Sequence, residues 1–479
     1  MRDFIAYTML LGALGTGGNM PFWATANQFG LMPESNGAVI SAYAGQSYHK
    51  EDAFQYHWAV SLAGRTDKSS AFQVIPDEIY AGIKWKPLSL DLGIWHRDRD
   101  FMACDARLGS LSTSSGNVIW SGNGRSMPGY SLKLDHWGIP GTKHIVEISG
   151  AWGDYKTIGQ RYVKGSWMHN LQAYLTLNVW RFSFEAGIDQ YALWGGVSPD
   201  YGKLPCTFRD YCRMCLGHSS GEGSPATDRY GTIGDQRGRG KLFLSYKHEG
   251  WKLSVQHDMI YDDRGFFWFE NWQDGVNTVC LSFEDKDRWV SDIAYEFVYT
   301  MWQSGPRHDR PATPEDIAKY GHNYPIIGTK FIIGGCDNYF NNGEYKSGWT
   351  SFGRTVGLPL ITPKGTGDGS WNRNKLTLGV ENNRVRAHHV GVSGKLFRKL
   401  PYKLMLTYSE NFGLYSNSDN PSSKTVEWPG ISQFSAGFNM IVPLLEGRLN
   451  IIPAIYFDCG NYVRNSFAAT LGVSYSICR

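Results

Sequence analysis

Two short stretches of the chain place aromatic rings beside amides and carboxylates, a combination suited to binding sugars. Residues 266–272 read FFWFENW and residues 337–342 read DNYFNN, and Trp194 lies in a similar Gly-flanked setting. The C–H faces of a sugar ring stack on aromatic side chains, while amides and carboxylates hydrogen-bond to its hydroxyls. We therefore predict sugar contacts here. The alternatives are an aromatic girdle at a membrane interface or a loop packed back onto the protein.

Polar residues also recur inside segments that otherwise read as strands. They are Asn27, Asn123, Arg125, Glu296, Gln303, Asn382, Arg384 and Arg386. A guanidinium that faces lipid at the bilayer midplane costs about 2–4 kcal/mol, so these side chains should point inward. An inward guanidinium pairs either with a protein carboxylate, which braces the interior, or with the carboxylate of an acidic sugar. Both interpretations remain open at this point.

The predicted sugar contacts share an aromatic, amide, carboxylate or guanidinium group in a loop or an inward position. They are Trp268, Asn271, Trp272, Asp274, Asn338, Tyr339, Asn342, Trp194, Arg125 and Arg384.

Patterns for catalysis or metal binding are weak. The sequence has no Gly-x-Ser-x-Gly motif, and adjacent acids such as Asp262 and Asp263 would face opposite ways on a strand. The spacing of Cys206, Cys212 and Cys215 allows a zinc site, a disulfide or unpaired thiols, and leaves the three open. We predict a protein that is not an enzyme and has neither metal nor cofactor.

The composition favours a membrane β-barrel. Aromatic residues make up 14% of the 479 residues, yet the mean hydropathy is only −0.35. A barrel alternates lipid-facing and lumen-facing side chains, so it stays polar on average while aromatic girdles mark its interfaces. No run approaches the roughly 18 apolar residues that a transmembrane helix needs. The net charge of +3 is too balanced for a nucleic-acid partner.

Short segments with period-two alternation recur along the whole chain and end at turn residues. Examples are residues 241–247 and 251–259, which are separated by His-Glu-Gly, and the longer segments 289–302 and 466–477. Within the last segment, residues 468–475 alternate well and are expected to close the sheet. Residues 4–14 are expected to form a strand, with any export signal upstream of Met1. Long polar loops are expected at residues 109–129, 194–240, 305–323 and 413–429. We predict an all-β protein with one domain (1–479), a transmembrane antiparallel barrel of about 16–18 strands with long extracellular loops and short periplasmic turns.

Several stretches resemble the capsule-assembly Wzi family, and they follow one another in order over nearly the whole chain. They are residues 21–30 (PFWATANQFG), 120–128 (WSGNGRSMP), 193–196 (LWGG), 271–275 (NWQDG), 295–300 (YEFVYT), 303–306 (QSGP), 337–342 (DNYFNN) and 381–385 (ENNRV). The cysteines near Cys212 and the lack of a clear signal peptide depart from this resemblance.

The resemblance implies an outer-membrane barrel of a Gram-negative bacterium that binds surface polysaccharide and contributes to capsule assembly or attachment. Its expected partners are capsular or surface polysaccharide and outer-membrane lipid, and its oligomeric state is left open. The alternative is a porin-like channel for small solutes or sugars, which the same barrel with inward charges would allow.

Overall fold

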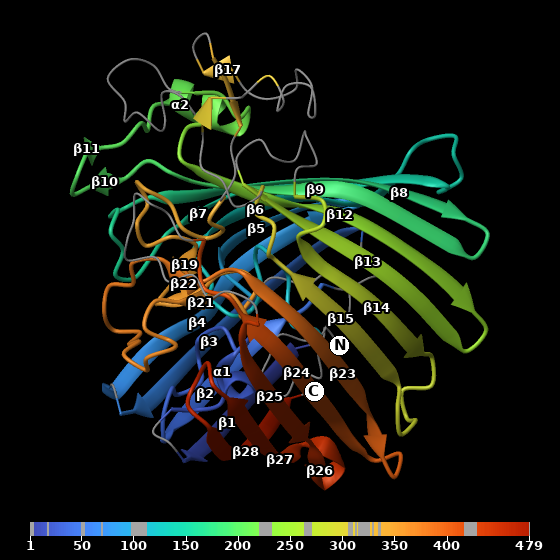
Figure 1. The fold of residues 1–479 in the computed structure, drawn as a ribbon. Helices are drawn as coiled ribbons and strands as arrows, with labels where there is room; N and C mark the ends of the chain where they lie inside the picture. Colours follow the sequence, from blue (N-terminus) through green and yellow to red (C-terminus); the bar gives the residue numbers. More distant parts are fainter. Residues whose placement is uncertain are drawn as a thin grey trace.

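The wall of the protein is a closed antiparallel β-barrel in the computed structural model (Figure 1). The structure describes residues 4–16, 19–48, 53–68, 70–96, 113–219, 232–262, 271–304, 310–311, 314, 326–327, 330–333, 337–415 and 429–478. In this part of the chain, 18 strands form the barrel, and each pairs with a neighbour on both sides. The predicted fold class and strand number are confirmed.

The wall strands are β1 (Phe4–Gly15), β2 (Gly37–Gln46), β3 (Phe54–Asp67), β4 (Ser70–Trp85), β5 (Leu88–Ile94), β6 (Gly129–Gly138), β7 (Val146–Lys156), β8 (Trp167–Val179), β9 (Phe182–Trp194), β12 (Asp235–His248), β13 (Trp251–Asp262), β14 (Gly275–Phe283), β15 (Asp292–Tyr299), β23 (Val385–Leu396), β24 (Leu400–Asn411), β25 (Ile431–Met440), β27 (Leu449–Gly460) and β28 (Ser466–Cys478). The shorter elements are α1 (Phe22–Thr25), β10 (Val197–Ser198), β11 (Gly202–Lys203), α2 (Phe208–Cys215), β16 (Arg310–Pro311), β17 (Ile326–Ile327), β18 (Lys330–Ile333), β19 (Thr350–Ser351), β20 (Arg354–Thr355), β21 (Thr362–Pro363), β22 (Val380–Asn382), β26 (Val442–Leu444) and a 3-10 turn at Leu445–Gly447.

The first and last strands close the barrel. β1 pairs with β28 from Ala6 opposite Cys478 to Gly15 opposite Ala468, with one irregularity after Ala6. Both predictions for these segments, a strand at residues 4–14 and a closing strand within residues 466–477, are confirmed. Closure matters because an open sheet edge would leave backbone N–H and C=O groups without partners in lipid.

The two ends of the barrel differ in the length of their connections. One end carries both termini and short turns such as residues 86–87, 180–181 and 249–250. The other end carries the long connections 16–36, 95–128, 195–234 and 300–384. In Figure 1, α2, β10, β11 and β17 gather at this long-loop end, at the upper left, whereas β26 lies at the opposite end. By the usual asymmetry of outer-membrane barrels the long-loop end is extracellular.

Two expected boundaries are corrected. The loop predicted at residues 194–240 is shorter, because β12 already begins at Asp235. The strand expected at residues 289–302 is confined to β15. It ends early because the N–H groups of Trp302 and Gln303 donate to the Asp274 carboxylate instead of to a neighbouring strand.

Side chains of the wall alternate between lipid and lumen. On β28, Leu471 is 57% exposed on the outer face, whereas Thr470 is 5% exposed inside. Exposed aromatic residues cluster at the short-turn end, among them Trp85, Trp180 and Phe397, as expected of an interfacial girdle. None of the helices in the described part of the chain has the length and apolarity needed to span a membrane.

Long connections fold back into the lumen instead of standing above it. Val118, Tyr339, Phe340 and Trp349, all from these connections, are buried against the inner face of the wall in one apolar cluster. A second cluster joins Trp23 and its neighbours to inner residues of β1, β24, β27 and β28. A barrel of this strand number would otherwise enclose an aqueous channel. The inner loops, residues 19–36, 113–128 and 337–384, therefore act as a plug.

We predict that Leu471→Arg lowers the free energy of unfolding by about 2–4 kcal/mol, because Leu471 lies on the lipid face near the middle of β28. Ile477→Arg, on the same face at the short-turn end of the strand, should cost at most about 1 kcal/mol. Unfolding titrations of the barrel in lipid vesicles measure both values. Equal costs at the two positions would contradict the assignment of the membrane span.

Candidate functional site

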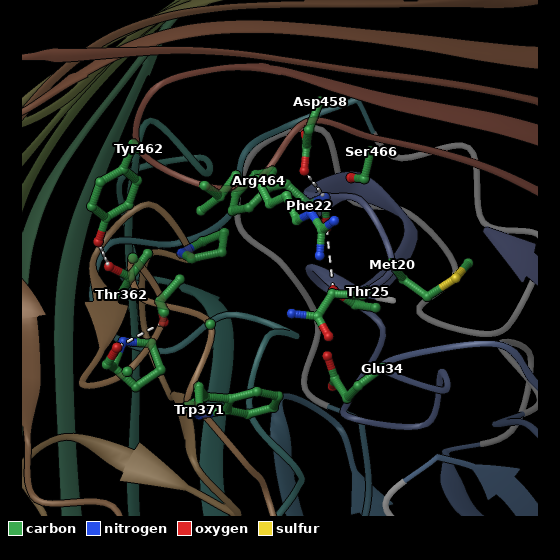
Figure 2. A pocket seen from close by; sticks show the side chains of 18 of the residues that line it. Met20, Phe22, Thr25, Glu34, Thr362, Trp371, Asp458, Tyr462, Arg464 and Ser466 are labelled. Carbon is green, nitrogen blue, oxygen red and sulfur yellow. Dashed lines mark hydrogen bonds between the residues drawn. The ribbon is translucent and has the colours of Figure 1, made fainter. Parts of the chain in front are cut away.

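A pocket of about 640 Å³ lies at the long-loop end, between the plug and the wall. One side is formed by residues of the 16–36 connection and another by residues 354–373 of the long connection after β15. The third side is the inner face of β24, β25, β27 and β28 near their outer ends. Figure 2 shows Met20, Thr25 and Glu34 facing Thr362, Trp371 and Tyr462 across this space. Its volume falls in the usual range of small-molecule sites.

Charged pairs fix the two inner segments against each other. The Arg354 guanidinium donates to both oxygens of Glu34, at 2.7 and 2.8 Å, and Arg373 also pairs with Glu34. Burial raises the pKa of the Glu34 carboxyl, but the attraction of Arg354 and Arg373 outweighs it and leaves the pKa below its ordinary value. Glu34 is therefore ionised at neutral pH and holds residues 354–373 against the 16–36 connection.

Hydrogen bonds to the wall fix the remaining sides. Asp458 of β27 accepts from the backbone N–H of Phe22 at 2.9 Å, which anchors α1. The hydroxyls of Thr362 and Tyr462 bond across the pocket edge. The indole N–H of Trp371 donates to the Gly353 carbonyl at 2.8 Å, which orients that ring. The pocket is thus a prearranged space whose walls do not depend on a ligand.

The pocket surface offers the groups that sugars need. Trp371 and Tyr462 supply aromatic rings, and Asn19, Asn372 and Gln433 supply amides. Rings of this kind stack on sugar C–H faces, and amides donate to and accept from hydroxyls. Exposed Lys68 and Arg464 also line the pocket, and neither forms an ion pair within the described part of the chain.

Three of the sequence-predicted contacts belong to one buried network of the plug. Asn271, Asp274 and Tyr339 are fully buried. Asn271 donates to Asp337 at 2.6 Å, and Asp274 accepts from the Tyr339 hydroxyl at 2.9 Å. Their polar groups bind the protein, so in this conformation they brace the loops and no ligand reaches them.

The other predicted loop residues are separated from one another. Trp272 is 65% exposed, and Trp268 lies outside the described residues. Asn338 accepts from the side-chain amides of Asn341 and Asn383. Asn342 accepts from the backbone N–H groups of Glu344 and Tyr345. Trp272 is thus exposed to solvent, and its contact with polysaccharide stays a prediction.

Trp194, Arg125 and Arg384 all point toward the protein interior. Trp194 is nearly buried against Tyr211 of α2, with ring centroids 5.2 Å apart. Arg384 stacks on Tyr415 at 4.0 Å, and Arg125 stacks on Phe352 at 4.0 Å. The two arginines lie in connections and not on the strands that the sequence had suggested, and neither lines the 640 Å³ pocket.

The pocket residues Trp371, Tyr462, Arg354 and Arg373 were not singled out from the sequence. A signal was available in residues 365–373, GTGDGSWNR, where a Trp stands among Gly, Asp and Asn. This is the same aromatic and polar combination that pointed to residues 266–272 and 337–342. The sequence does not show which of these loops is accessible to solvent.

The cysteines near α2 are unpaired in the structure. Cys206, Cys212 and Cys215 are free, so the disulfide interpretation is not supported. Cys215 Sγ lies 3.6 Å from His169 Nε2, and His169 Nδ1 lies 2.9 Å from Asp154, an arrangement like that of a nucleophilic triad. However, burial raises the pKa of the Cys215 thiol to about 11, and the residue ends α2, where the helix dipole disfavours a thiolate.

The potential metal cluster in the described part of the chain lies elsewhere. Asp77, Glu78 and His96 have ligand atoms within 4.8 Å of one another. His96 Nε2 lies 2.7 Å from Asp77 and its Nδ1 lies 3.8 Å from Glu78, so an ion-pair network accounts for the group. An irregularity between Ser61 and Leu62 in the β3–β4 register lets the two adjacent acids share the lumen side.

We predict a pH dependence of stability from Asp274, whose pKa burial raises to about 6 from an ordinary value of 3.8. Because the pKa of the folded state lies above that of the unfolded state, stability should fall as the pH rises from about 4 through about 6. The full change is about 3 kcal/mol at 1.4 kcal/mol per pKa unit. Urea unfolding at a series of pH values measures it.

Asp274→Asn should flatten this slope by the contribution of Asp274, because an amide does not titrate in this range. Asp135→Asn, at an exposed position of β6 near the short-turn end, serves as the matched control and should keep the wild-type slope. The same slope in Asp274→Asn and wild type would contradict the assignment.

Comparison with solved structures agrees with the barrel. The chain is 11% identical to the Escherichia coli outer membrane protein Wzi, titled a carbohydrate-binding β-barrel involved in group 1 capsule assembly, with a TM-score of 0.53 over 100% of this chain and 85% of that one. The Pseudomonas aeruginosa proteins OccK3 and OpdK match at 10% and 9% identity, with TM-scores of 0.45 and 0.46, over 99% of this chain and 96% and 98% of theirs. Neither a protein-family model nor a curated protein matches the sequence. The likeness establishes the fold, and the protein is an outer-membrane-type β-barrel.

Proposed function

We propose that the protein is a polysaccharide-binding barrel of the Gram-negative outer membrane that contributes to capsule assembly or attachment without catalysing a reaction. The observation that carries the proposal is the pocket at the extracellular end, where Trp371 and Tyr462 meet amides and hydroxyls (Figure 2). Wzi, described as carbohydrate-binding and involved in capsule assembly, supports the proposal through its shared architecture. The stretches that resemble the Wzi family, which follow one another in order along the sequence, also support the proposal.

The position of the pocket suits a long polymer. The pocket lies at the end where the long connections are, which is the end expected to face the outside of the cell. Its wall residues Ser409, Gln433 and Ser435 place hydroxyl and amide groups along one side. A site held by the ion pairs of Glu34 loses little entropy on binding, because its shape exists beforehand.

We predict that Trp371→Ala weakens binding of the surface polysaccharide extracted from the producing cells by about tenfold, because a stacking ring contributes on the order of 1 kcal/mol. Trp180→Ala, at a turn of the opposite end, is the matched control and should bind as wild type does. Titration calorimetry on the purified barrel measures the three affinities.

Trp272→Ala distinguishes the pocket from the loop predicted from the sequence. The pocket proposal expects this variant to bind normally. Loss of binding in Trp272→Ala with full binding in Trp371→Ala would contradict the pocket as the site. A deletion strain that keeps its capsule attached would contradict the role in capsule assembly.

The alternative, a porin-like channel, has a physical basis in the charged lumen. Arg237, Arg239 and Lys241 of β12 line the inner face, but each is paired with a carboxylate of the wall. The plug fills the space beside them with apolar residues such as Tyr339 and Trp349. We therefore expect the purified barrel to give no stepwise conductance in planar bilayers. Porin-sized conductance steps would favour the channel instead.

A further inference from the structure

Four arginines converge beneath the pocket. Arg65 of β3, Arg125, Arg354 and Arg373 border a small cavity of about 10 Å³. Arg354 and Arg373 line the main pocket as well, so the two spaces share a wall. A cavity of this size has room for about one acceptor atom, such as a chloride ion or one oxygen of a carboxylate.

The carboxylates at this cluster do not match the guanidiniums in number. Glu34 pairs with Arg354 and Arg373, and Asp67 lies 3.7 Å from Arg65 and 3.8 Å from Arg373. Asp77 attracts the charge of Arg125, although the two groups are farther apart than an ion pair. Among the described residues, three carboxylates thus face four guanidiniums, and one of the three is already bonded to His96. Buried charge of one sign in excess is costly, and a bound anion would remove that cost.

Some hydrogen-bond donors of these arginines also lack an acceptor in the described part of the chain. The Nε atoms of Arg65 and Arg373 have no acceptor within hydrogen-bond distance in the described part of the chain, although both side chains are more than nine-tenths buried. The guanidinium carbon of Arg125 lies 4.0 Å from the centre of the Phe352 ring, and Arg125 forms no ion pair with any described residue. Guanidinium N–H groups nearly always find acceptors when buried.

The backbone is shaped to admit these side chains. Gly30 has a φ of +65°, and a Cβ atom at this position would lie 2.8 Å from Arg125 Cγ. Its carbonyl accepts from Arg65 at 2.6 Å and from Arg373 at 3.4 Å. Burial and the charge of Arg373 lower the pKa of Arg125 to about 10 despite the attraction of Asp77. Arg125 is still charged at neutral pH, so the cluster keeps its positive excess.

We propose that this arginine cluster is an anion site that holds a single compact acceptor, either a free halide or the carboxylate of an acidic sugar that enters from the pocket. Both ligands would place one negatively charged atom among the guanidiniums of Arg65, Arg125 and Arg373. The free-halide source is independent of the proposed function. The sugar carboxylate rests on it, because the sugar must first occupy the pocket.

The first experiment tests the free anion on the full-length barrel in detergent. Sodium chloride is titrated against sodium methanesulfonate at constant ionic strength while the thermal midpoint is recorded. We expect a saturable rise with chloride in wild type and a concentration for half-effect at least tenfold higher in Arg125→Gln. Arg398→Gln, an exposed arginine at the short-turn end, is the matched control and should behave as wild type does. Bromide-soaked wild-type crystals should show anomalous scattering within the cluster, which needs no variant to fold.

The second experiment tests the sugar carboxylate. Trigalacturonate and its methyl ester are compared by titration calorimetry, and the proposal expects at least tenfold preference for the free acid, lost in Arg125→Gln. The anion site is overturned if acid and ester bind equally, no bromide is found in the cluster and chloride has no saturable effect. That result leaves the proposed glycan binding intact. If neither sugar binds, a saturable chloride effect that depends on Arg125 still supports the anion site, and its absence overturns it.

Discussion

A sheet that crosses lipid must pair every strand edge, and the rest of this structure depends on that constraint. Water is absent from the bilayer core, so an unpaired edge would leave a row of N–H and C=O groups without partners. The pairing of β1 with β28 meets the requirement and brings both termini to the same end. The long connections lie at the opposite end, together with the pocket.

Closure at 18 strands creates a second requirement, because wall side chains alone do not fill so wide a lumen. Loops that enter the lumen bring backbone groups that must be satisfied there. Buried side chains perform this task. Asp274 accepts from the N–H groups of Trp302 and Gln303, and Arg161 donates to the Gly348 carbonyl at 3.1 Å. The polar residues that the sequence placed inside the barrel are thus largely the internal partners of the plug.

The strands were predictable because period-two alternation is a local property of each segment. The start of β28 and its role as the closing strand follow from residues 466–477 alone. The binding residues were not predictable in the same way, since Asn271 and Trp371 lie in loops of similar composition. Asn271 is buried by its bonds to Asp337 and Ser304, while Trp371 lines the pocket. That difference arises from long-range packing between connections far apart in the sequence.

The location of the pocket follows from how the plug divides. Residues 337–361 and 118–119 pack on the inner face of β7, β8, β9 and β13–β15, whereas Trp23 and Met20 pack on β1, β24, β27 and β28. The pocket lies at the seam between these two packed units, where Phe22 contacts both apolar clusters and Glu34 pairs with Arg354 and Arg373. Apolar packing excludes water and ligands from an interface, but an interface of charged groups keeps its solvent and its donors. The feature that holds the two halves of the plug together is therefore also the feature that leaves a polar, ligand-sized space between them.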